Sequence, residues 1–326
     1  MALSMLPGLL LTALLLTSCG GSSEEPAAQA PGAAGSAGTA GAAGSSGEPP
    51  TEEGAYDPEP IGGARPTKIY VPKGYVKGEP RPLVVLLHGY GASGALQELL
   101  FQLAPEADRR GFLYIHPDGI QDKGGLRFWN ATEACCDFGV ERADDSAYLL
   151  GLVDEVAARY PVDPGRVYFT GHSNGSFMSL RLACDHADRV AAVVGLAGAM
   201  PVDVSACKPS RPVAVLHAHG DADEDIKYEG GSFSGGGTYP GAKTTVEAWA
   251  TLNGCSLDAD TSPPPLDLEG GVPGAETTVA RYAKGCKPGG HAELWTLQGG
   301  PHIPNLTKTW ASATVDFLYA HARSGD

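Results

Sequence analysis

A sharp turn around Ser173 is the feature that most restricts how this chain can fold. The segment Gly171-His172-Ser173-Asn174-Gly175 follows a β-prone run, Val167–Thr170, and precedes a stretch with apolar residues at helical spacing. In a nucleophile elbow, a serine lies on a strained strand-to-helix turn where side chains two residues away on either side would collide, so glycine is needed at both places. We therefore predict that Ser173 is a catalytic nucleophile; the alternative is a surface serine in a glycine-rich loop.

Short β-prone runs alternate with amphipathic stretches from about residue 61 onward, a pattern typical of a mostly parallel sheet with crossover helices. Several runs are continuously apolar, as expected for strands covered on both faces. The predicted strands are Thr67–Val71, Leu83–Leu87, Phe112–His116, Val167–Thr170, Val190–Leu196, Val213–His217, Val279–Tyr282 and Leu294–Leu297. The predicted helices are Leu96–Arg109, Asp145–Arg159, Asn174–Ala187, Ala242–Leu252 and Thr307–Ala322. We expect an α/β fold with a mostly parallel central sheet and helices on both faces.

A serine becomes an effective nucleophile only when a base takes its proton and an acid orients that base. In folds built around an elbow, the acid and the base follow the serine in that order along the chain. His302 comes directly after the last expected strand, so we predict that it is the base. The run from His219 to Asp223 follows an earlier strand, and it offers two carboxylates for the acid, Asp221 and Asp223.

An oxyanion hole is the fourth part of such a site. The apolar run Leu83–Leu87 leads into His88-Gly89-Tyr90-Gly91, where backbone N–H groups of a turn can face the serine. We expect the N–H groups of Tyr90 and Asn174 to bind the developing oxyanion, and His88 to orient the turn by hydrogen bonding. The alternative is a plain turn after a core strand.

The N-terminal segment has the features of an export signal. Residues 1–18 contain an apolar run of about a dozen residues, which is too short to span a bilayer and matches a signal h-region. The sequence Leu16-Thr17-Ser18-Cys19 is similar to a bacterial lipobox, so we expect Cys19 to be lipidated; a cleaved secretory signal is the alternative. Residues 19–60 are rich in Gly, Ala, Ser, Pro and Glu, and we interpret them as a disordered tether. The folded domain is then expected at 61–326.

The charge of the chain excludes one class of partner. The formal net charge is −15, so no basic surface is expected that could hold nucleic acid. Seven carboxylates lie in residues 1–60, which have no Lys or Arg, so the remaining chain is only mildly acidic. The sequence predicts no contact with a membrane other than through the lipidated N-terminus, and it does not predict an oligomeric state.

Six cysteines follow Cys19, an even number that favours disulfides in an exported protein. Six cysteines allow fifteen pairings. We predict Cys184 with Cys207, Cys255 with Cys286, and the adjacent Cys135 and Cys136 with each other. A zinc site is the alternative, but no CxxC spacing accompanies these cysteines.

Together these motifs resemble the secreted α/β-hydrolase esterases of the polyhydroxybutyrate depolymerase and feruloyl esterase type. The resemblance runs from about Gly62 to Ala322. It rests on Leu87-His88-Gly89, Pro117-Asp118-Gly119, Trp129-Asn130-Ala131 followed by Cys135-Cys136, Asp144-Asp145, Gly171–Gly175, His219–Asp223 and Gly299–His302. It implies an α/β-hydrolase fold with Asp223 as the acid and Asp221 as the second choice. Pro301 stands where the family usually has glycine, which affects the expected substrate preference more than the triad.

The acidic and histidine cluster also resembles two kinds of metal-binding motif. His217-Ala218-His219-Gly220-Asp221 is similar to a dinuclear zinc motif, but Ala222 replaces a required histidine. Asp221, Asp223 and Asp225 are spaced like the start of a calcium loop, yet Ile226 occupies the position that needs glycine. Asp144 and Asp145 are expected to start a helix, although Asp145 also remains a third candidate for the acid.

The sequence as a whole predicts an exported serine carboxylesterase that works through an acyl-enzyme on a hydroxyalkanoate oligomer or on an aryl or acyl ester. No metal or organic cofactor is implied. Trp129 and His172 are expected to line the substrate pocket. Two alternatives remain: a catalytically silent surface lipoprotein that binds polymer or carbohydrate, and a serine peptidase on the same fold.

Overall fold

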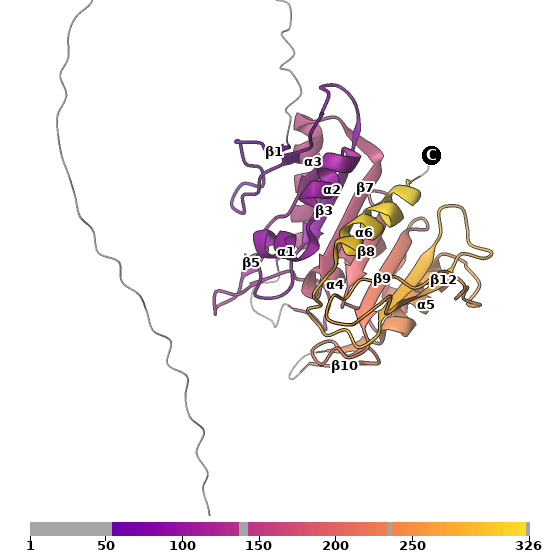
Figure 1. The fold of residues 1–326 in the computed structure, drawn as a ribbon. Coiled ribbons are helices and arrows are strands. Elements are labelled where there is room, and N and C mark those ends of the chain that lie inside the picture. The colour runs from indigo at the N-terminus through magenta and orange to yellow at the C-terminus, as the bar shows by residue number, and fades with distance from the viewer. Residues whose placement is uncertain (1–53, 137–142, 234–236, 324–326) are drawn as a thin grey trace, which may run out of the picture. The chain divides into compact units, whose positions relative to one another are not determined.

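A nine-stranded sheet forms the centre of the domain (Figure 1). The computed structural model describes residues 54–136, 143–233 and 237–323. The strands lie in the order β1 (Ala55–Tyr56), β2 (Tyr70–Val71), β4 (Leu113–Ile115), β3 (Arg81–Leu87), β7 (Val162–His172), β8 (Ala192–Leu196), β9 (Ala214–Gly220), β13 (Ala292–Leu297) and β12 (Thr277–Tyr282). The six strands from β4 to β13 are parallel, and antiparallel strands flank them at both edges. The predicted fold class is confirmed.

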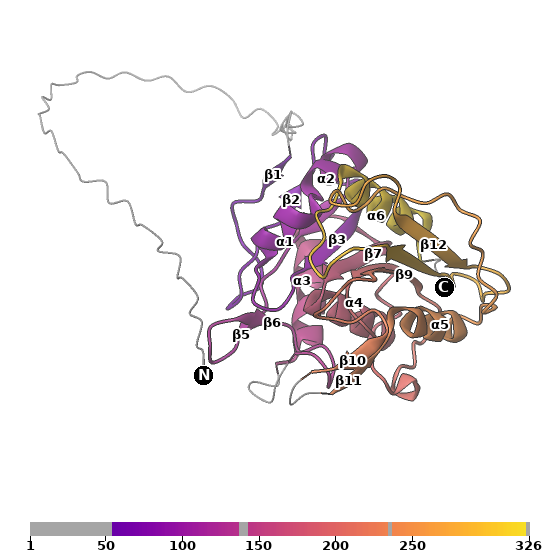
Figure 2. The ribbon, with the colours of Figure 1, turned by 60° about the horizontal axis from the view of Figure 1, so that its bottom comes forward.

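Helices cover both faces of the sheet, and each face has its own apolar core (Figure 2). Side chains along a strand point alternately to the two faces. On β3, Leu83, Val85 and Leu87 enter one core, while Val84 and Leu86 enter the other. The first core is closed by α3 (Asp145–Arg159), α4 (Asn174–Asp185) and α5 (Ala242–Leu252), and the second by α1 (Gly94–Phe101), α2 (Ala104–Arg110) and α6 (Lys308–Ala320). This double coverage explains why the central strands are continuously apolar.

The prediction of one helix over 96–109 is wrong, because α1 and α2 are separate helices. Gln102 ends α1 in a left-handed conformation with φ of 53°, and a proline stands in the first turn of α2. The Glu98 carboxylate accepts hydrogen bonds from the N–H groups of Leu103 and Ala104, at 3.1 and 2.8 Å. These bonds satisfy the free donors at the start of α2, so the break is stable.

The predicted domain boundary at residue 61 is too late. β1 pairs with β2, and the Asp57 N–H donates to the Ile69 carbonyl at 2.7 Å. The Tyr160 hydroxyl also donates to the Asp57 carboxylate at 2.6 Å. These contacts tie residues 55–57 to the domain, so the domain includes residues before 61. The predicted signal, Cys19 and most of the predicted tether lie outside the described residues.

The sequence does not predict two short hairpins, because strands of two or three residues show almost no periodicity. They are β5 (Ile120–Gln121) with β6 (Arg127–Phe128), and β10 (Gly230–Ser232) with β11 (Thr238–Pro240). The first hairpin matters for the site, because the Arg127 carbonyl accepts a hydrogen bond from the Gly91 N–H at 2.8 Å. It thus supports the turn that follows β3.

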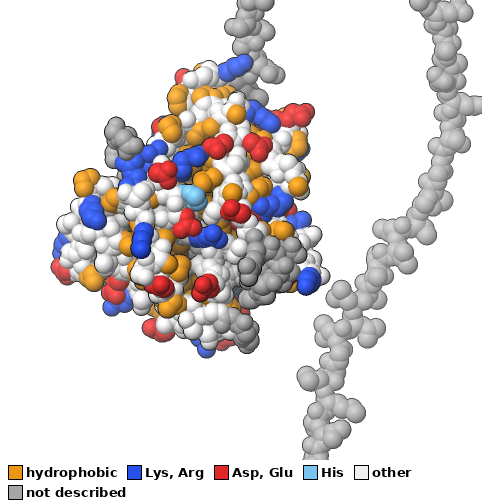
Figure 3. Space-filling model, turned by 180° about the vertical axis from the view of Figure 1, so that it is seen from behind, with side chains coloured by type: hydrophobic (Ala, Val, Ile, Leu, Met, Phe, Trp, Pro, Cys, Tyr) orange, Lys and Arg blue, Asp and Glu red, His pale blue; other side chains and the backbone are white. Residues whose placement is uncertain are grey.

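The described part of the chain contains three disulfides, Cys135–Cys136, Cys184–Cys207 and Cys255–Cys286. Cys184–Cys207 connects α4 to the loop that follows β8, and Cys255–Cys286 connects the segment after α5 to the loop between β12 and β13. On the face seen in Figure 3, acidic and basic side chains are interspersed, in agreement with a mildly acidic domain. Among the described helices, none has the length and apolar character needed to cross a bilayer.

Candidate active site

Ser173 lies on a sharp turn between β7 and α4, as the glycine pattern predicts. Its backbone has φ of 52° and ψ of −121°, a strained conformation for a residue with a side chain. A β-carbon on Gly171 would lie 2.6 Å from the Gly175 backbone, and one on Gly175 would lie 2.2 Å from the Leu87 carbonyl oxygen. Glycine is therefore required on both sides of the serine, and the turn presents Ser173 beside the N-terminus of α4.

His302 and Asp223 complete a continuous line of hydrogen bonds with the serine. The Ser173 hydroxyl lies 3.0 Å from His302 Nε2, and His302 Nδ1 lies 2.8 Å from Asp223 Oδ2. The three residues come from the loops after β7, β9 and β13, whose carboxyl ends meet at one edge of the sheet. Each distance is within hydrogen-bond range, so a proton can pass from the serine to the imidazole.

The structure separates the three carboxylates that the sequence offered. The Asp223 side chain is fully buried and faces His302. Asp221 is exposed, and its carboxylate accepts a hydrogen bond from the Gly299 N–H at 2.6 Å, which ties the acid loop to the base loop. Asp145 is buried elsewhere, with an ion pair of 2.5 Å to Arg65. Only Asp223 is placed to orient the base.

Asp223 is held in its charged form. Burial raises the pKa of this carboxyl, but hydrogen bonds from His219 and His302 together with backbone N–H groups outweigh burial and hold the pKa well below its usual value. The oxygen not facing His302 accepts hydrogen bonds from the N–H groups of Asp225 and Ile226, at 2.9 and 2.8 Å. An ionised acid keeps the Nδ1–H tautomer of His302 and leaves Nε2 free to accept the serine proton.

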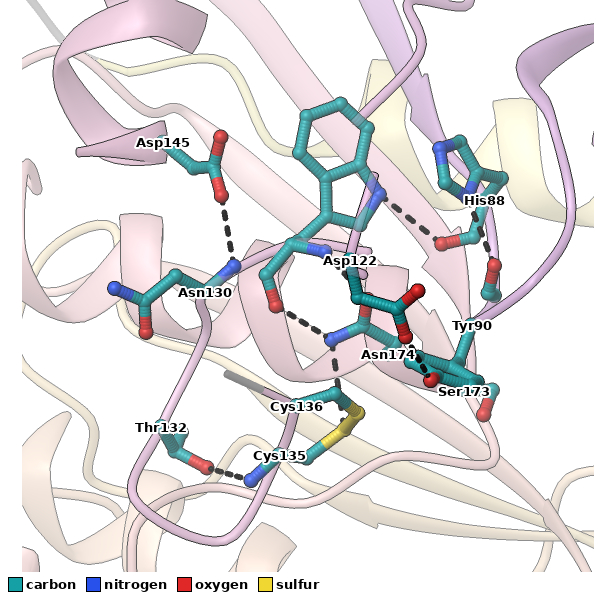
Figure 4. Close-up of a disulfide and its surroundings, with 12 residues drawn as sticks. His88, Tyr90, Asp122, Asn130, Thr132, Cys135, Cys136, Asp145, Ser173 and Asn174 are labelled. Atoms are coloured by element: carbon teal, nitrogen blue, oxygen red, sulfur yellow. Dashed lines mark hydrogen bonds between the residues drawn. A yellow bond between two sulfur atoms is a disulfide. The ribbon is translucent and has the colours of Figure 1, made fainter. Parts of the chain in front are cut away.

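On the other side of Ser173, the side chain of Asn174 locks the predicted oxyanion region (Figure 4). Its amide oxygen accepts from the Trp129 N–H at 2.7 Å, and its amide nitrogen donates to the Trp129 carbonyl at 2.8 Å. The same nitrogen lies 3.4 Å from Cys135 Sγ, so the Cys135–Cys136 disulfide also braces it. The backbone of Asn174, where the predicted N–H donor lies, is thereby fixed.

The turn after β3 approaches the elbow closely. A β-carbon on Gly89 would lie 3.2 Å from His172 Nδ1 and 3.4 Å from Ser173 Cβ, so Tyr90 comes next to the nucleophile (Figure 4). His88 Nδ1 donates to the Gly89 carbonyl at 2.8 Å, and its Nε2 accepts from the Gly119 N–H at 2.9 Å. The prediction that His88 orients this turn is confirmed. The Tyr90 hydroxyl donates to Asp122 at 2.5 Å, which fixes the ring.

Known proteins share parts of this sequence and its fold. The sequence model of the phospholipase/carboxylesterase family matches residues 75–234, a stretch that contains Ser173 and Asp223. Feruloyl esterase B of Piromyces equi is 30% identical over 241 residues, which cover 72% of this chain and 42% of that protein. These matches support an esterase of the α/β-hydrolase fold. NocK of Nocardia uniformis subsp. tsuyamanensis, named as an esterase, is 29% identical over 249 residues, which cover 73% of this chain and 68% of NocK.

Solved structures agree on the fold. The acetyl xylan esterase from Aspergillus awamori aligns with a TM-score of 0.55 and 15% identity, over 82% of this chain and 98% of that chain. A thermostable esterase aligns with a TM-score of 0.53 and 13% identity, over 83% of this chain and 64% of that chain. At these identities the likeness concerns the fold alone. The chain spans less than half the length of feruloyl esterase B.

Two side chains expected in the substrate pocket also hold loops of the site through hydrogen bonds. Trp129 is fully buried and donates from its indole N–H to the His88 carbonyl at 3.1 Å, so it braces the turn after β3. His172 is 5% exposed and donates from Nε2 to the His302 carbonyl at 2.8 Å, so it supports the base loop. Burial, together with the nearby His302, lowers the pKa of His172 to about 4, so this ring stays neutral. Each large side chain is used to hold a loop.

The residues of the competing metal motifs are already engaged with one another. His217 Nε2 and His219 Nδ1 are 3.1 Å apart, and Asp221 faces Gly299, so the zinc-like motif does not converge on one point. Within the described residues, the carboxylates of Asp223 and Asp225 with His302 form a group that could hold a cation. Both Asp223 oxygens already accept hydrogen bonds, so this cluster is explained by the triad geometry.

Proposed function

We propose that this protein is a serine carboxylesterase with Ser173 as nucleophile, His302 as base and Asp223 as the acid that orients the base. The observation that carries the proposal is the unbroken line from the Ser173 hydroxyl through His302 to the buried Asp223 carboxylate, at 3.0 and 2.8 Å. The family match, which covers two of these three residues, supports ester hydrolysis over peptidase activity or a silent binding role.

The proposed reaction has two halves. Ser173 Oγ attacks the ester carbonyl as His302 Nε2 takes its proton, and the N–H groups of Tyr90 and Asn174 stabilise the resulting oxyanion. The imidazolium then protonates the departing alcohol and leaves an acyl-enzyme. Water attacks this acyl group with His302 again as base, which releases the acid and restores Ser173.

For the substrate class, we favour aryl and acyl esters over hydroxyalkanoate oligomers. The relatives that support this choice are named as feruloyl esterases. Rates on methyl ferulate, p-nitrophenyl acetate and a hydroxybutyrate oligomer decide between them. A preference for the oligomer by kcat/KM would reverse the choice.

The nucleophile is tested by replacing it. Ser173→Ala is expected to lower kcat on p-nitrophenyl acetate by about 10³-fold or more while the melting temperature stays close to that of the parent, because only binding and the oxyanion hole remain. Ser312→Ala, a half-buried position on α6, serves as the matched control and should keep full activity. A fluorophosphonate probe should label the parent and Ser312→Ala but not Ser173→Ala. Labelling of another serine would overturn the assignment.

Export and anchoring complete the proposal. Three disulfides fit an oxidising compartment and support an extracellular location. We propose that residues 1–18 direct export, that Cys19 carries lipid, and that the segment from Cys19 to the mid-fifties tethers the domain to a membrane surface. In cells that process lipoproteins, Cys19→Ser should move the esterase from the membrane fraction to the soluble fraction. An unchanged distribution would argue for a cleaved secretory signal.

A further inference from the structure

His219 is a buried histidine next to the proposed triad that has no part in the proposed reaction. It lies on β9, is 1% exposed, and its Nε2 is 3.3 Å from Asp223 Oδ2. That is the same carboxylate oxygen that His302 Nδ1 approaches at 2.8 Å. Two histidines thus face one oxygen of the acid from different sides.

The hydrogen-bond partners of His219 determine where its proton lies. Nε2 is 2.7 Å from the Ile226 carbonyl, and a carbonyl can only accept, so Nε2 carries the hydrogen. That nitrogen also lies 3.3 Å from Asp223 Oδ2. On the other side of the ring, Nδ1 lies 3.1 Å from His217 Nε2, and we assign the hydrogen of this bond to His217.

His217 is a neutral ring in this arrangement. It is fully buried, and burial, together with His219, holds its pKa well below the usual value. With the hydrogen on Nε2, its Nδ1 is an acceptor without a partner among the described residues. On a strand, residues two apart point to the same face, so β9 lines both rings up behind Asp223.

We propose that His219 is a positioning residue that presents Asp223 to His302, as the second link of a relay that runs from His217 through His219 to the acid. The inference rests on the proposed function. Backbone N–H groups hold one oxygen of Asp223, and the His219 N–H faces the other at 3.3 Å, so the carboxylate is kept turned toward His302. The same N–H withdraws negative charge from the oxygen that faces the base.

This role predicts two changes when the donor is removed. In His219→Phe, a less constrained Asp223 should lower kcat by roughly 10- to 100-fold, the range for losing a hydrogen bond to a charged group. The carboxylate also becomes a stronger partner for the imidazolium, so the acid limb of the kcat/KM profile should move to higher pH by roughly half a unit. A residue that only fills space would lower the melting temperature without moving that limb.

A shift of the acid limb can be assigned to His219 only if the other titratable groups around it keep their protonation behaviour. They are Asp223, His217 and Tyr228, with His302 and His172 beyond them. Tyr228 packs edge-on against the His219 ring and is bonded to Thr296 at 2.7 Å. Tyr228→Phe should therefore leave the acid limb in place.

Three variants form the test. His219→Gln places an amide N–H near the original Nε2 and should restore most of the kcat and the parental acid limb. His217→Phe removes the donor to His219 Nδ1, one ring further from Asp223, and should move the limb less than His219→Phe does. Tyr228→Phe is the control that should leave the limb unmoved. Should His219→Phe not fold, His219→Leu takes its place as the smaller apolar variant.

A second measurement does not depend on turnover. The downfield proton resonance of the His302 Nδ1–H bond to Asp223 should shift in His219→Phe and return in His219→Gln. The role of His219 is overturned if His219→Phe keeps the parental kcat, the parental acid limb of the kcat/KM profile and the parental His302 resonance. It is also overturned if the kcat of His219→Gln is no higher than that of His219→Phe. If the parent protein has no esterase activity, or if the fluorophosphonate probe labels a serine other than Ser173, the proposed function is wrong.

Discussion

The two sides of Ser173 are held in different ways. On one side, side chains bond to side chains, from the Ser173 hydroxyl to His302, then Asp223, with His219 behind it. On the other side, side chains bond to backbone, since Asn174 and Trp129 hold the elbow and the turn after β3. The first side performs chemistry with atoms that a single substitution removes. The second presents backbone amides, which a change of side chain other than to proline leaves in place, so its support is spread over several residues.

The largest difference between the two sides is expected when the charge of Asp223 is removed. Asp223→Asn should lower kcat by about 10⁴-fold at neutral pH with little change in melting temperature, because an amide holds the wrong tautomer of His302. Rates and thermal melts of purified variants measure this.

Two other carboxylates are controls for that prediction. Asp145→Asn should keep its rate and lose roughly 1 to 3 kcal/mol of stability, because the ion pair with Arg65 is partly buried. Asp221→Asn should show an intermediate loss of rate, because its bond to Gly299 joins the acid and base loops. A fully active Asp223→Asn enzyme would leave Asp221 as the next candidate.

The oxyanion side is tested through the side chain of Asn174. Asn174→Ala removes both bonds to the Trp129 backbone and leaves a buried N–H and carbonyl unsatisfied, so stability should fall by roughly 2 to 4 kcal/mol. The rate should fall by only about 10-fold, because the backbone N–H of residue 174 remains. A loss as large as that of Asp223→Asn would show that the two sides do not differ in this way.

His172 connects the two sides and predicts a pH dependence of stability. Its pKa is about 4 in the folded protein and 6.5 as its ordinary value. Between these values the unfolded chain binds a proton that the folded protein does not, so stability should fall as the pH drops from about 6.5 toward 4, by up to roughly 1.4 kcal/mol per unit. His172→Gln should flatten this dependence in urea melts at several pH values. A parental slope in that variant would assign the acid sensitivity to other groups.

The smallest effect is expected at the Cys135–Cys136 disulfide. Sulfur is a weak acceptor, so Cys135→Ala should slow turnover only about twofold through Asn174. As a control, the double variant Cys255→Ala, Cys286→Ala should lose roughly 3 to 4 kcal/mol of stability with an unchanged rate, since it opens a long loop away from Ser173. Equal loss of rate in the two variants would mean that neither disulfide acts through the site.

Local sequence determined much of this protein. The glycines beside Ser173 are needed because the backbone of the turn leaves no room for a β-carbon, and that requirement is visible in five residues. Helices α3 and α5 have the predicted bounds, since an aspartate or glycine start and an apolar stripe lie within each segment. The position of His302 followed from chain order, because the last parallel strand delivers it to the same edge of the sheet.

Tertiary structure decided what local pattern could not express. Asp221 and Asp223 are two residues apart and equally acidic, and only the approach of the β13 loop buries one against His302 and leaves the other at Gly299. For Trp129 and His172, the sequence shows the type of side chain, and only the structure shows that the ring N–H of each bonds to a backbone carbonyl. The approach of His219 to Asp223 depends on how the chain turns at Ile226. The spacing of residues in the sequence does not determine a distance of a few ångströms between two side chains.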